Sequence, residues 1–482
     1  MKITIDSTAI TPFPHFWETV FGSEGAYYPA RPDLQGHFRR AHEAFGTQYM
    51  RFHGILHDAN LLYFEDDLGR PYYHFDGVDR CYDPLVAMGM RPFVELSFMP
   101  VALARAYDSI FAWQGITAPP RDVQAWEQLI AAFTRHCVDR YGLAEVRQWY
   151  FEVWNEANLH GAFWTGTQQD YWELYAAAAR AVKSVDAELR VGGPASAGAE
   201  WVAELLAYCA EQQAPIDFVS YHGYPTDEGY VVGGEPMAFK GPGFWREAAA
   251  RNQRLVSASA FPSVEIHVTE WNSSPGSRDE THDTTFGAAY VCQAIDEVAG
   301  YVDSFSYWTV SDIFQEGGYP MSEFHGGFGL LTIHGIRKPS WYAFTLLHCL
   351  GTERLATTID GAPSGMGAIV TRSERGVQVL SWHFIQPPDD TRQPEPVVTR
   401  IPLADGEYRL TEHLIAADHG DPLTRWHAMG RPEKPDAAQL AELHACEPAF
   451  TARRIHVTGG SYTDKATLIP GSVRLVELEK MP

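Results

Sequence analysis

Short apolar runs alternate with longer amphipathic stretches from about residue 15 to residue 350, and few folds accommodate such a pattern. Each run has four to eight residues and is rich in β-branched or aromatic side chains, which predicts strands buried on both faces. A weaker run near His15–Phe21 brings the expected number of strands to eight. The stronger runs are Tyr49–Phe52, Arg91–Phe98, Trp149–Trp154, Leu189–Gly193, Asp217–Tyr221, Glu265–Thr269 and Ser304–Val310.

The stretches between these runs carry apolar residues at helical spacing. The clearest are Arg121–Tyr141, Asp170–Val185 with Asp170 as the expected N-cap, Ala199–Gln213 and Thr284–Ala299. Strands that alternate with helices form parallel sheets, so the pattern predicts an α/β fold of the closed (β/α)8 type, a TIM barrel. A doubly wound open sheet is the alternative, but no G-x-G-x-x-G motif follows the first run.

The character of the sequence changes after about residue 350, where short β-rich segments with turn residues predict an accessory antiparallel β-sandwich. The opening MKITID alternates like a strand and is expected to join this sandwich. We therefore expect a (β/α)8 barrel over residues 15–350 and an accessory domain made of residues 1–14 plus 351–482. Within the latter, residues 386–396 are expected to form a long exposed loop, and residues 421–445 a loop and one helix.

The charge balance excludes some classes of partner. Thirty-seven basic and 61 acidic side chains give a net charge of −24, which argues against nucleic acid or an anionic membrane as the partner. No apolar stretch approaches the roughly 18 residues of a membrane span. The six cysteines lack metal-ligand spacing and the first residues lack an apolar signal core, so a cytoplasmic location is the default expectation. Nothing in the sequence requires a metal or a cofactor, and the sequence is compatible with a homo-oligomer.

Two glutamates stand where a barrel carries its chemistry, at the carboxyl ends of strands. Glu156 closes WYFEVWNE, and Glu270 closes EIHVTE. If these are the fourth and seventh strands, the two carboxyl groups face each other across the barrel mouth. Glycoside hydrolysis needs such a pair, one as acid and one as base or nucleophile. A single glutamate here would more often be a solvated strand end or half of an ion pair, but the joint pattern favours catalysis.

Other polar and aromatic residues end the neighbouring runs. Asn155 could donate to a sugar 2-hydroxyl or cap a turn, and Tyr224 could hold Glu270 ionised or be a core phenol. His53 and His222 could bind sugar hydroxyls or be structural. Trp308 could form an apolar floor under a sugar ring or simply line the barrel.

At these residues the sequence resembles glycoside hydrolase family thirty-nine, the retaining β-xylosidases. The resemblance extends over about residues 20–350, and the shared motifs occur in the family's order. They are RPFVELSFMP, FEVWNEANL, ARAVKSVD followed by VGGPA, DFVSYHGY, HVTEWN, YVDSFSYWTVSDIF, and FHGGFGL followed by KPS.

The resemblance implies that Glu156 is the general acid/base and Glu270 the nucleophile. It also implies that His53, Asn155, His222, Tyr224, Trp308 and Glu316 line the donor-sugar subsite. The chain departs from the family at Ala157, where proline is frequent, and at Gln315–Glu316, where paired acids are frequent; the second departure could shift the sugar preference.

The implied activity is exo-acting hydrolysis of xylo-oligosaccharides or aryl β-xylosides through a covalent glycosyl-enzyme. Another glycosidase of the same family (α-L-iduronidase-like, β-glucosidase or arabinosidase) is the nearest alternative. A non-catalytic sugar-binding barrel is the alternative from a different class.

Overall fold

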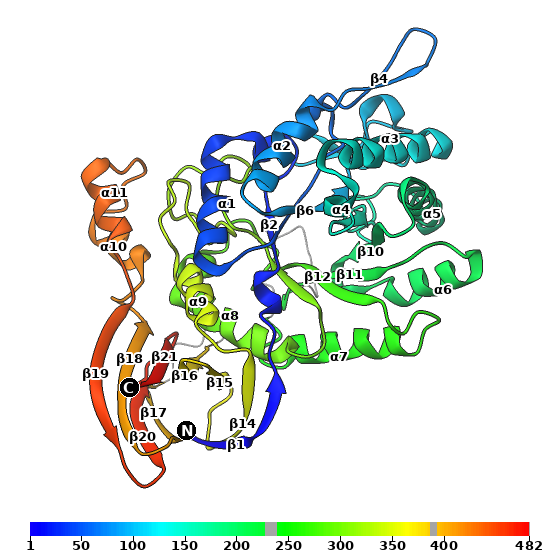
Figure 1. Cartoon of the computed structure of the whole chain (residues 1–482). Helices are drawn as coiled ribbons and strands as arrows, with labels where there is room; N and C mark the ends of the chain where they lie inside the picture. The colour runs from blue at the N-terminus through cyan, green and yellow to red at the C-terminus, as the bar shows by residue number, and fades with distance from the viewer. Residues whose placement is uncertain (227–238, 386–392, 482) are drawn as a thin grey trace.

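The computed structural model describes residues 1–226, 239–385 and 393–481, which form a barrel and an accessory sheet. Eight parallel strands close into the barrel, as the alternating pattern predicted (Figure 1). In chain order they are β2 (Val20–Ser23), β3 (Tyr49–Phe52), β6 (Arg91–Leu96), β9 (Tyr150–Val153), β10 (Arg190–Ser196), β11 (Phe218–Gly223), β12 (Glu265–Trp271) and β13 (Ser304–Tyr307). The barrel closes where Tyr307 of β13 pairs with Phe21 of β2.

Helices surround the barrel, and their apolar faces pack with the strands into one large core. They are α1 (Pro32–Phe45), α2 (Asp76–Ala87), α3 (Val123–Tyr141), α4 (Leu143–Val146), α5 (Gln168–Val185), α6 (Val202–Gln212), α7 (Phe244–Ser257), α8 (Thr285–Val298) and α9 (Pro339–His348). Two small hairpins stand in loops that leave the barrel: β4 (Tyr63–Glu65) with β5 (Pro71–Tyr73), and β7 (Ser109–Ile110) with β8 (Gly115–Ile116). Among the described residues, no helix combines the length and apolarity needed to cross a bilayer.

Nine strands form the accessory sheet, in the order β19-β18-β21-β16-β15-β14-β1-β17-β20. They are β1 (Lys2–Pro12), β14 (Glu353–Asp360), β15 (Met366–Ser373), β16 (Gly376–His383), β17 (Glu395–Pro402), β18 (Gly406–Ile415), β19 (Ala449–Val457), β20 (Ser461–Leu468) and β21 (Val473–Lys480). The sheet curls on itself, because apolar residues of β1 and β17 share one cluster with those of β16 and β18 (Figure 1). The opening segment joins this sheet as predicted, but it pairs in parallel with β17, so the sheet is not purely antiparallel.

Two predicted elements begin elsewhere than expected. The run near His15–Phe21 is not a strand throughout: a 3-10 turn, Phe16–Glu18, closes through a hydrogen bond from the Glu18 amide to the His15 carbonyl, and β2 starts only at Val20. Asp170 is not the N-cap of α5. Thr167 is, because its hydroxyl accepts from the Asp170 amide while the Asp170 carboxylate accepts from the Thr167 amide.

The C-terminal region also differs from expectation. Residues 421–445 hold two helices, α10 (Pro422–Ala428) and α11 (Ala437–His444), because Asp421 and Asp436 each cap a separate helix start. The two helices bury Trp426 and Leu443 against the barrel loop that contains Phe324. Of the loop expected at 386–396, residues 386–392 lie outside the described residues, and β17 already begins at Glu395.

A buried ion triad fixes the last barrel helix. Lys338 precedes α9, and its Nζ lies 2.6 Å from Asp283 Oδ1 and 2.7 Å from Asp312 Oδ2. The lysine also donates to the Gly327 carbonyl at 2.8 Å. The three side chains are almost wholly withdrawn from solvent, so each charge depends on the other two.

We expect Lys338→Met to lower the free energy of unfolding by about 3–5 kcal/mol, because two buried carboxylates would lose their cation. Arg372→Met is the matched control, since Arg372 pairs with Glu353 where both side chains are about half exposed, and it should cost about 1 kcal/mol or less. Chemical denaturation followed by tryptophan fluorescence measures both. Equal losses for the two variants would contradict the role assigned to the triad.

Candidate active site

The carboxyl ends of the barrel strands bring the eight candidate residues into one connected group. Glu156 follows β9, the fourth barrel strand, and Glu270 lies in β12, the seventh. Seven of the eight side chains are buried, and Glu316 is partly buried. The other members follow or end their strands: His53 after β3, Asn155 after β9, His222 in β11, Tyr224 after β11, and Trp308 and Glu316 after β13.

The two glutamates meet around one histidine. His222 Nδ1 lies 2.8 Å from Glu156 Oε1 and 3.6 Å from Glu270 Oε2. One carboxylate oxygen of each glutamate and this nitrogen all lie within 4.8 Å of one another. Burial, followed by the charges of Arg51 and His53, holds the pKa of His222 well below its usual value, so the ring is neutral at ordinary pH. A neutral imidazole with its proton on Nδ1 can donate to Glu156 without neutralising either carboxyl group.

Arg51, a buried arginine at the end of a strand, contacts several members of this group. The sequence analysis assigned it no role. Arg51 Nε donates to Glu152 Oε2 at 2.7 Å, and Nη2 lies 2.8 Å from Glu95 Oε2 and 2.9 Å from Asn155 Oδ1. Its Nη1 lies 3.4 Å from Glu270 Oε2. These partners come from β6, β9 and β12 and from the turn after β9. Sequence reasoning missed Glu95 and Glu152 because both stand inside apolar runs; a charged residue there is itself a signal, since an unpaired buried charge is rare.

Opposing influences act on the acidity of Glu270. Burial raises the pKa of its carboxyl group, while the charges of His53 and Arg51 and the hydrogen bond from the Tyr224 hydroxyl lower it. Burial prevails, and the pKa lies above the usual glutamate value. Arg51 and Tyr224 therefore limit how far burial can push Glu270 toward its protonated form.

The turn that presents Asn155 and Glu156 has an unusual backbone. Trp154 and Glu156 both adopt left-handed conformations, with φ of 72° and 45°. The Glu156 amide donates to the Ala195 carbonyl at 2.8 Å, and Trp154 Nε1 donates to the Phe163 carbonyl at 2.9 Å, which holds the turn. Non-glycine residues rarely keep such conformations except where the surroundings enforce them, and active sites are a common place for it.

Asn155 has a buried donor with no protein acceptor. Its Oδ1 accepts from Arg51, which fixes the orientation of the amide. Its Nδ2 has no hydrogen-bond partner within the described ranges 1–226, 239–385 and 393–481. Because an unsatisfied buried donor is costly, this atom is suited to a ligand oxygen.

A second part of the group surrounds His53. Its Nδ1 lies 2.7 Å from Glu95 Oε2, and its Nε2 lies 3.4 Å from Glu316 Oε1. The ring centroid is 4.8 Å from that of Trp308 and 5.8 Å from that of Phe111, which stacks on it. The site thus presents aromatic surface beside polar groups, the combination that carbohydrate rings require.

Trp308 occupies space that only a glycine leaves open. A Cβ atom on Gly22 of β2 would come within 2.2 Å of Trp308 Cε3. Phe314 and Phe328 pack with the indole to complete a small apolar cluster. The absence of a side chain at Gly22 in the first barrel strand therefore provides the space that Trp308 occupies.

Glu24, which the sequence analysis did not single out, lies just after β2 and is fully buried. Its carboxylate accepts from the Gly25 amide at 2.8 Å, from Trp113 Nε1 at 3.1 Å, and from the Gln315 amide. Burial raises the pKa of Glu24, and burial with neighbouring carboxylates raises the pKa of Glu316 well above its usual value. The carboxyl groups of Glu24 and Glu316 therefore tend to keep their protons.

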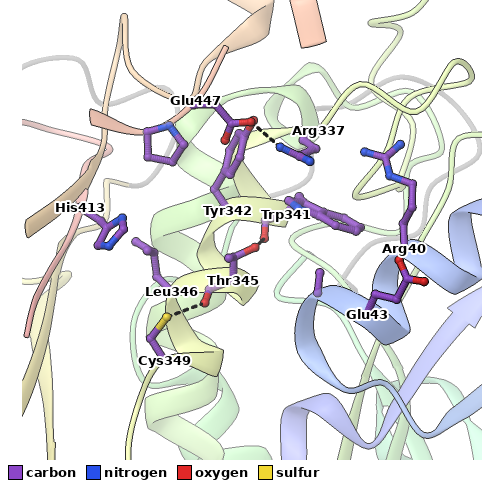
Figure 2. Close-up of a pocket in the computed structure, with 12 residues that line it drawn as sticks. Arg40, Glu43, Arg337, Trp341, Tyr342, Thr345, Leu346, Cys349, His413 and Glu447 are labelled. Atoms are coloured by element: carbon purple, nitrogen blue, oxygen red, sulfur yellow. Dashed lines mark hydrogen bonds and ion pairs between the residues drawn. The ribbon is translucent and has the colours of Figure 1, made fainter. Parts of the chain in front are cut away.

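A separate cavity of about 440 Å³ lies between α1, α9 and accessory strand β18, and none of the eight candidates lines it (Figure 2). Arg337 pairs with Glu447 across it, and Arg40 lies over the Trp341 ring at 5.5 Å. It belongs to the junction of barrel and sheet and not to the group around Glu156 and Glu270. The lining residues are Arg40, Glu43, Ala44, Arg337, Trp341, Tyr342, Thr345, Leu346, Cys349, His413, Glu447 and Pro448.

Known proteins resemble this chain along its whole length. A beta-xylosidase of Geobacillus stearothermophilus is 35% identical over 489 residues, covering 99% of this chain and 95% of that protein. A beta-xylosidase of Caldicellulosiruptor saccharolyticus is 38% identical over 457 residues, covering 92% and 91%. The crystal structure of a monomeric beta-xylosidase from Caulobacter crescentus CB15 aligns with a TM-score of 0.90 at 34% identity, covering 100% of both chains. The model of glycosyl hydrolases family 39 matches residues 1–462, and the chain belongs to that family.

Proposed function

We propose that this protein is a retaining, exo-acting β-xylosidase that releases xylose from the non-reducing ends of xylo-oligosaccharides. The observation that carries the proposal is the approach of Glu156 and Glu270 around His222, with one oxygen of each carboxyl group within 4.8 Å of the other. Retaining glycosidases separate their carboxyl groups by about 5–5.5 Å, and inverting ones by about 6.5–9.5 Å to admit a water molecule. The short approach supports retention.

The reaction has two steps. In the first, a Glu270 oxygen attacks the anomeric carbon while Glu156 donates a proton to the departing glycosidic oxygen, so the glycosidic bond breaks and a xylosyl ester of Glu270 forms. In the second, ionised Glu156 takes a proton from water, whose oxygen attacks the same carbon. Xylose leaves with its original anomeric configuration, and Glu270 regains its charge.

The surrounding side chains suit the donor sugar. Asn155 Nδ2, the buried donor without a protein partner, would hold the 2-hydroxyl, where hydrogen bonds strengthen in the transition state. His53 and Glu316 would bind further hydroxyls, and Trp308 would lie under the apolar face of the ring. Arg51 and Tyr224 would keep Glu270 oriented for attack.

The charge of the site supports a neutral sugar over a uronic acid. Burial raises the pKa of Glu316, and the carboxyl groups of Glu24, Glu270, Glu95 and Glu156 raise it further. A sugar carboxylate would add another negative charge at a place that already disfavours the ionised form of Glu316. Aryl β-xylosides and xylo-oligosaccharides are therefore favoured over α-L-iduronides, in keeping with the beta-xylosidases named above.

The departure at Gln315 also bears on sugar choice. The Gln315 side-chain oxygen accepts a hydrogen bond from the Tyr28 hydroxyl, and the Gln315 backbone amide donates one to the Glu24 carboxylate. The residue is thus tied into the wall of the site and adds no negative charge where relatives often carry an acid. We propose that this lowers the charge next to Glu316 and tunes the preference among neutral sugars.

We expect Glu270→Gly to reduce kcat/KM for an aryl β-xyloside by at least about 10⁴-fold, because the attacking oxygen is lost. Azide should restore turnover and give α-xylosyl azide, since it enters from the face vacated by Glu270. Product analysis by NMR measures the anomer. Glu156→Ala is the matched comparison: azide there should give β-xylosyl azide, because the ester on Glu270 still forms first.

The panel of substrates should include aryl β-glucoside, α-L-arabinoside and α-L-iduronide. Wild-type protein without activity on the xyloside would overturn the assignment. The same azide product from both variants would show that the two roles are assigned incorrectly. Sugar binding without any turnover would favour the non-catalytic barrel.

We expect Tyr224→Phe to move the acidic limb of the kcat/KM profile upward by about one pH unit. Glu270 must be ionised to attack, so activity is lost as the pH falls through its pKa, which burial already raises. Loss of the hydroxyl that donates to Glu270 Oε1 raises that pKa further. Tyr49→Phe is the control, because it loses a hydrogen bond to the Gln148 carbonyl outside the site. A shift of the limb in the control, or none in Tyr224→Phe, would contradict the role of Tyr224.

We also propose that residues 15–350 form the catalytic unit and that residues 1–14 with 351–482 form the accessory unit. The pairing of β1 with β14 and β17 supports this division.

A reducing compartment such as the cytoplasm is proposed for the protein, and the six cysteines, which are all free in the structure, support it.

A further inference from the structure

Two segments cross between the barrel and the accessory sheet, and they meet. The first runs from the end of β1 at Pro12 to the start of β2 at Val20, and the second runs from the end of α9 at His348 to the start of β14 at Glu353. The Phe13 amide donates to the Thr352 carbonyl at 2.8 Å, which joins the two crossings through the backbone.

Three metal-ligating side chains converge at this meeting point. His15 and Glu18 come from the first crossing, and His348 comes from the last residue of α9. Glu18 Oε1 lies 3.0 Å from His15 Nδ1 and 2.9 Å from His348 Nδ1, and the three ligand atoms all lie within 4.8 Å of one another.

Both separations to Glu18 Oε1 are hydrogen-bond distances, and they also bring the three atoms close enough to share one metal ion. Bonds of about 2.05 Å from zinc to imidazole nitrogen or carboxylate oxygen place adjacent ligand atoms about 2.9 Å apart at a right angle and about 3.4 Å apart at the tetrahedral angle. Small side-chain movements would therefore suffice to admit an ion between the three atoms.

The charge of Glu18 points to a cation. Its side chain is only 10% exposed, and among the ion pairs of the described chain its partners are His15 and His348, with no lysine or arginine. A nearly buried carboxylate needs a cationic partner, which here is either a protonated imidazole or a metal ion held together with the imidazoles. Two imidazoles and one carboxylate suit zinc and its first-row neighbours better than magnesium or calcium, which favour oxygen ligands alone.

The surroundings hold the ligands and leave an entrance. His15 stacks on Trp17, with ring centroids 4.6 Å apart, which fixes the plane of the imidazole. Gly46 leaves room beside the site: even an added Cβ there would stay 3.8 Å from His348 Cε1 and 3.9 Å from Glu18 Oε2. The His348 side chain is 45% exposed, so an ion and its remaining water ligands can reach the site from solvent.

From this convergence we propose that His15, Glu18 and His348 bind one divalent transition-metal ion of the zinc type, which clamps the two crossings between the barrel and the accessory sheet. Water completes the shell beside the three protein ligands. The role is structural, and the site is distinct from Glu156, His222 and Glu270, where two carboxyl groups are required for the sugar chemistry.

The first test is titration of the chelator-treated full-length protein with Co²⁺, whose visible absorption reports coordination by nitrogen and oxygen ligands. Wild-type protein should bind the ion with an absorption band that Zn²⁺ abolishes by competition. His348→Ala and Glu18→Gln should weaken this binding by more than about tenfold, since even changes outside the ligand set commonly cost that much. His456→Ala is the matched control, because His456 pairs with Glu407 on the accessory sheet far from the crossings in sequence.

Zn²⁺ should also raise the midpoint of thermal unfolding of wild type and His456→Ala, and should not raise that of His348→Ala. Activity on the aryl xyloside verifies that each variant is folded. A Zn²⁺-soaked wild-type crystal gives a readout that needs no variant: anomalous scattering between the three side chains is expected. Wild type and His348→Ala with equal affinity for Co²⁺, or a soaked crystal without anomalous scattering at this place, would overturn the proposal.

Discussion

A single buried guanidinium group holds the barrel mouth together. Arg51 contacts Glu152, Glu95, Glu270 and Asn155, so one side chain from β3 connects to strands β6, β9 and β12 and to the turn after β9. The planar fork of arginine allows each nitrogen to face a different partner, which the single ammonium of lysine cannot do. Because the guanidinium and its carboxylates are desolvated together, the position of each depends on the others. Placement of Glu270 is thus a property of the closed barrel and not of one loop.

The same arrangement explains why the site contains more acids than bases. Arg51 compensates the carboxylates nearest to it, whereas Glu316 and Glu24 lie where burial raises their pKa. Protons can remain in that part of the site without disturbing the pair that performs the chemistry. The site therefore combines carboxyl groups of different proton affinity within one pocket, the condition under which one acid can donate while another attacks.

Much of the fold could be predicted from sequence because parallel strands buried on both faces leave a continuous apolar signal. The strand with the weakest signal was placed wrongly: Phe16 and Trp17 are apolar neighbours in a 3-10 turn, and apolar content alone does not distinguish such a turn from a short strand. The strand ends revealed Glu156 and Glu270, since acids directly after apolar runs are conspicuous. Glu95 and Glu152 were missed because their role depends on Arg51, a contact between strands that no local pattern records. The two helices after Asp421 and Asp436 were merged into one because their short apolar faces form only against the barrel loop.

The place of β1 in the accessory sheet affects when this sheet can form during synthesis of the chain. This strand precedes every strand of the barrel, yet its neighbours β14 and β17 begin at Glu353 and Glu395, after all of them. Until those residues leave the ribosome, β1 presents unpaired backbone on both edges, and such edges invite pairing with other chains. The barrel can assemble earlier from segments adjacent in sequence, whereas the sheet can close only at the end of synthesis. Shortening the chain from its C-terminal side would therefore disturb its first residues as well as its last.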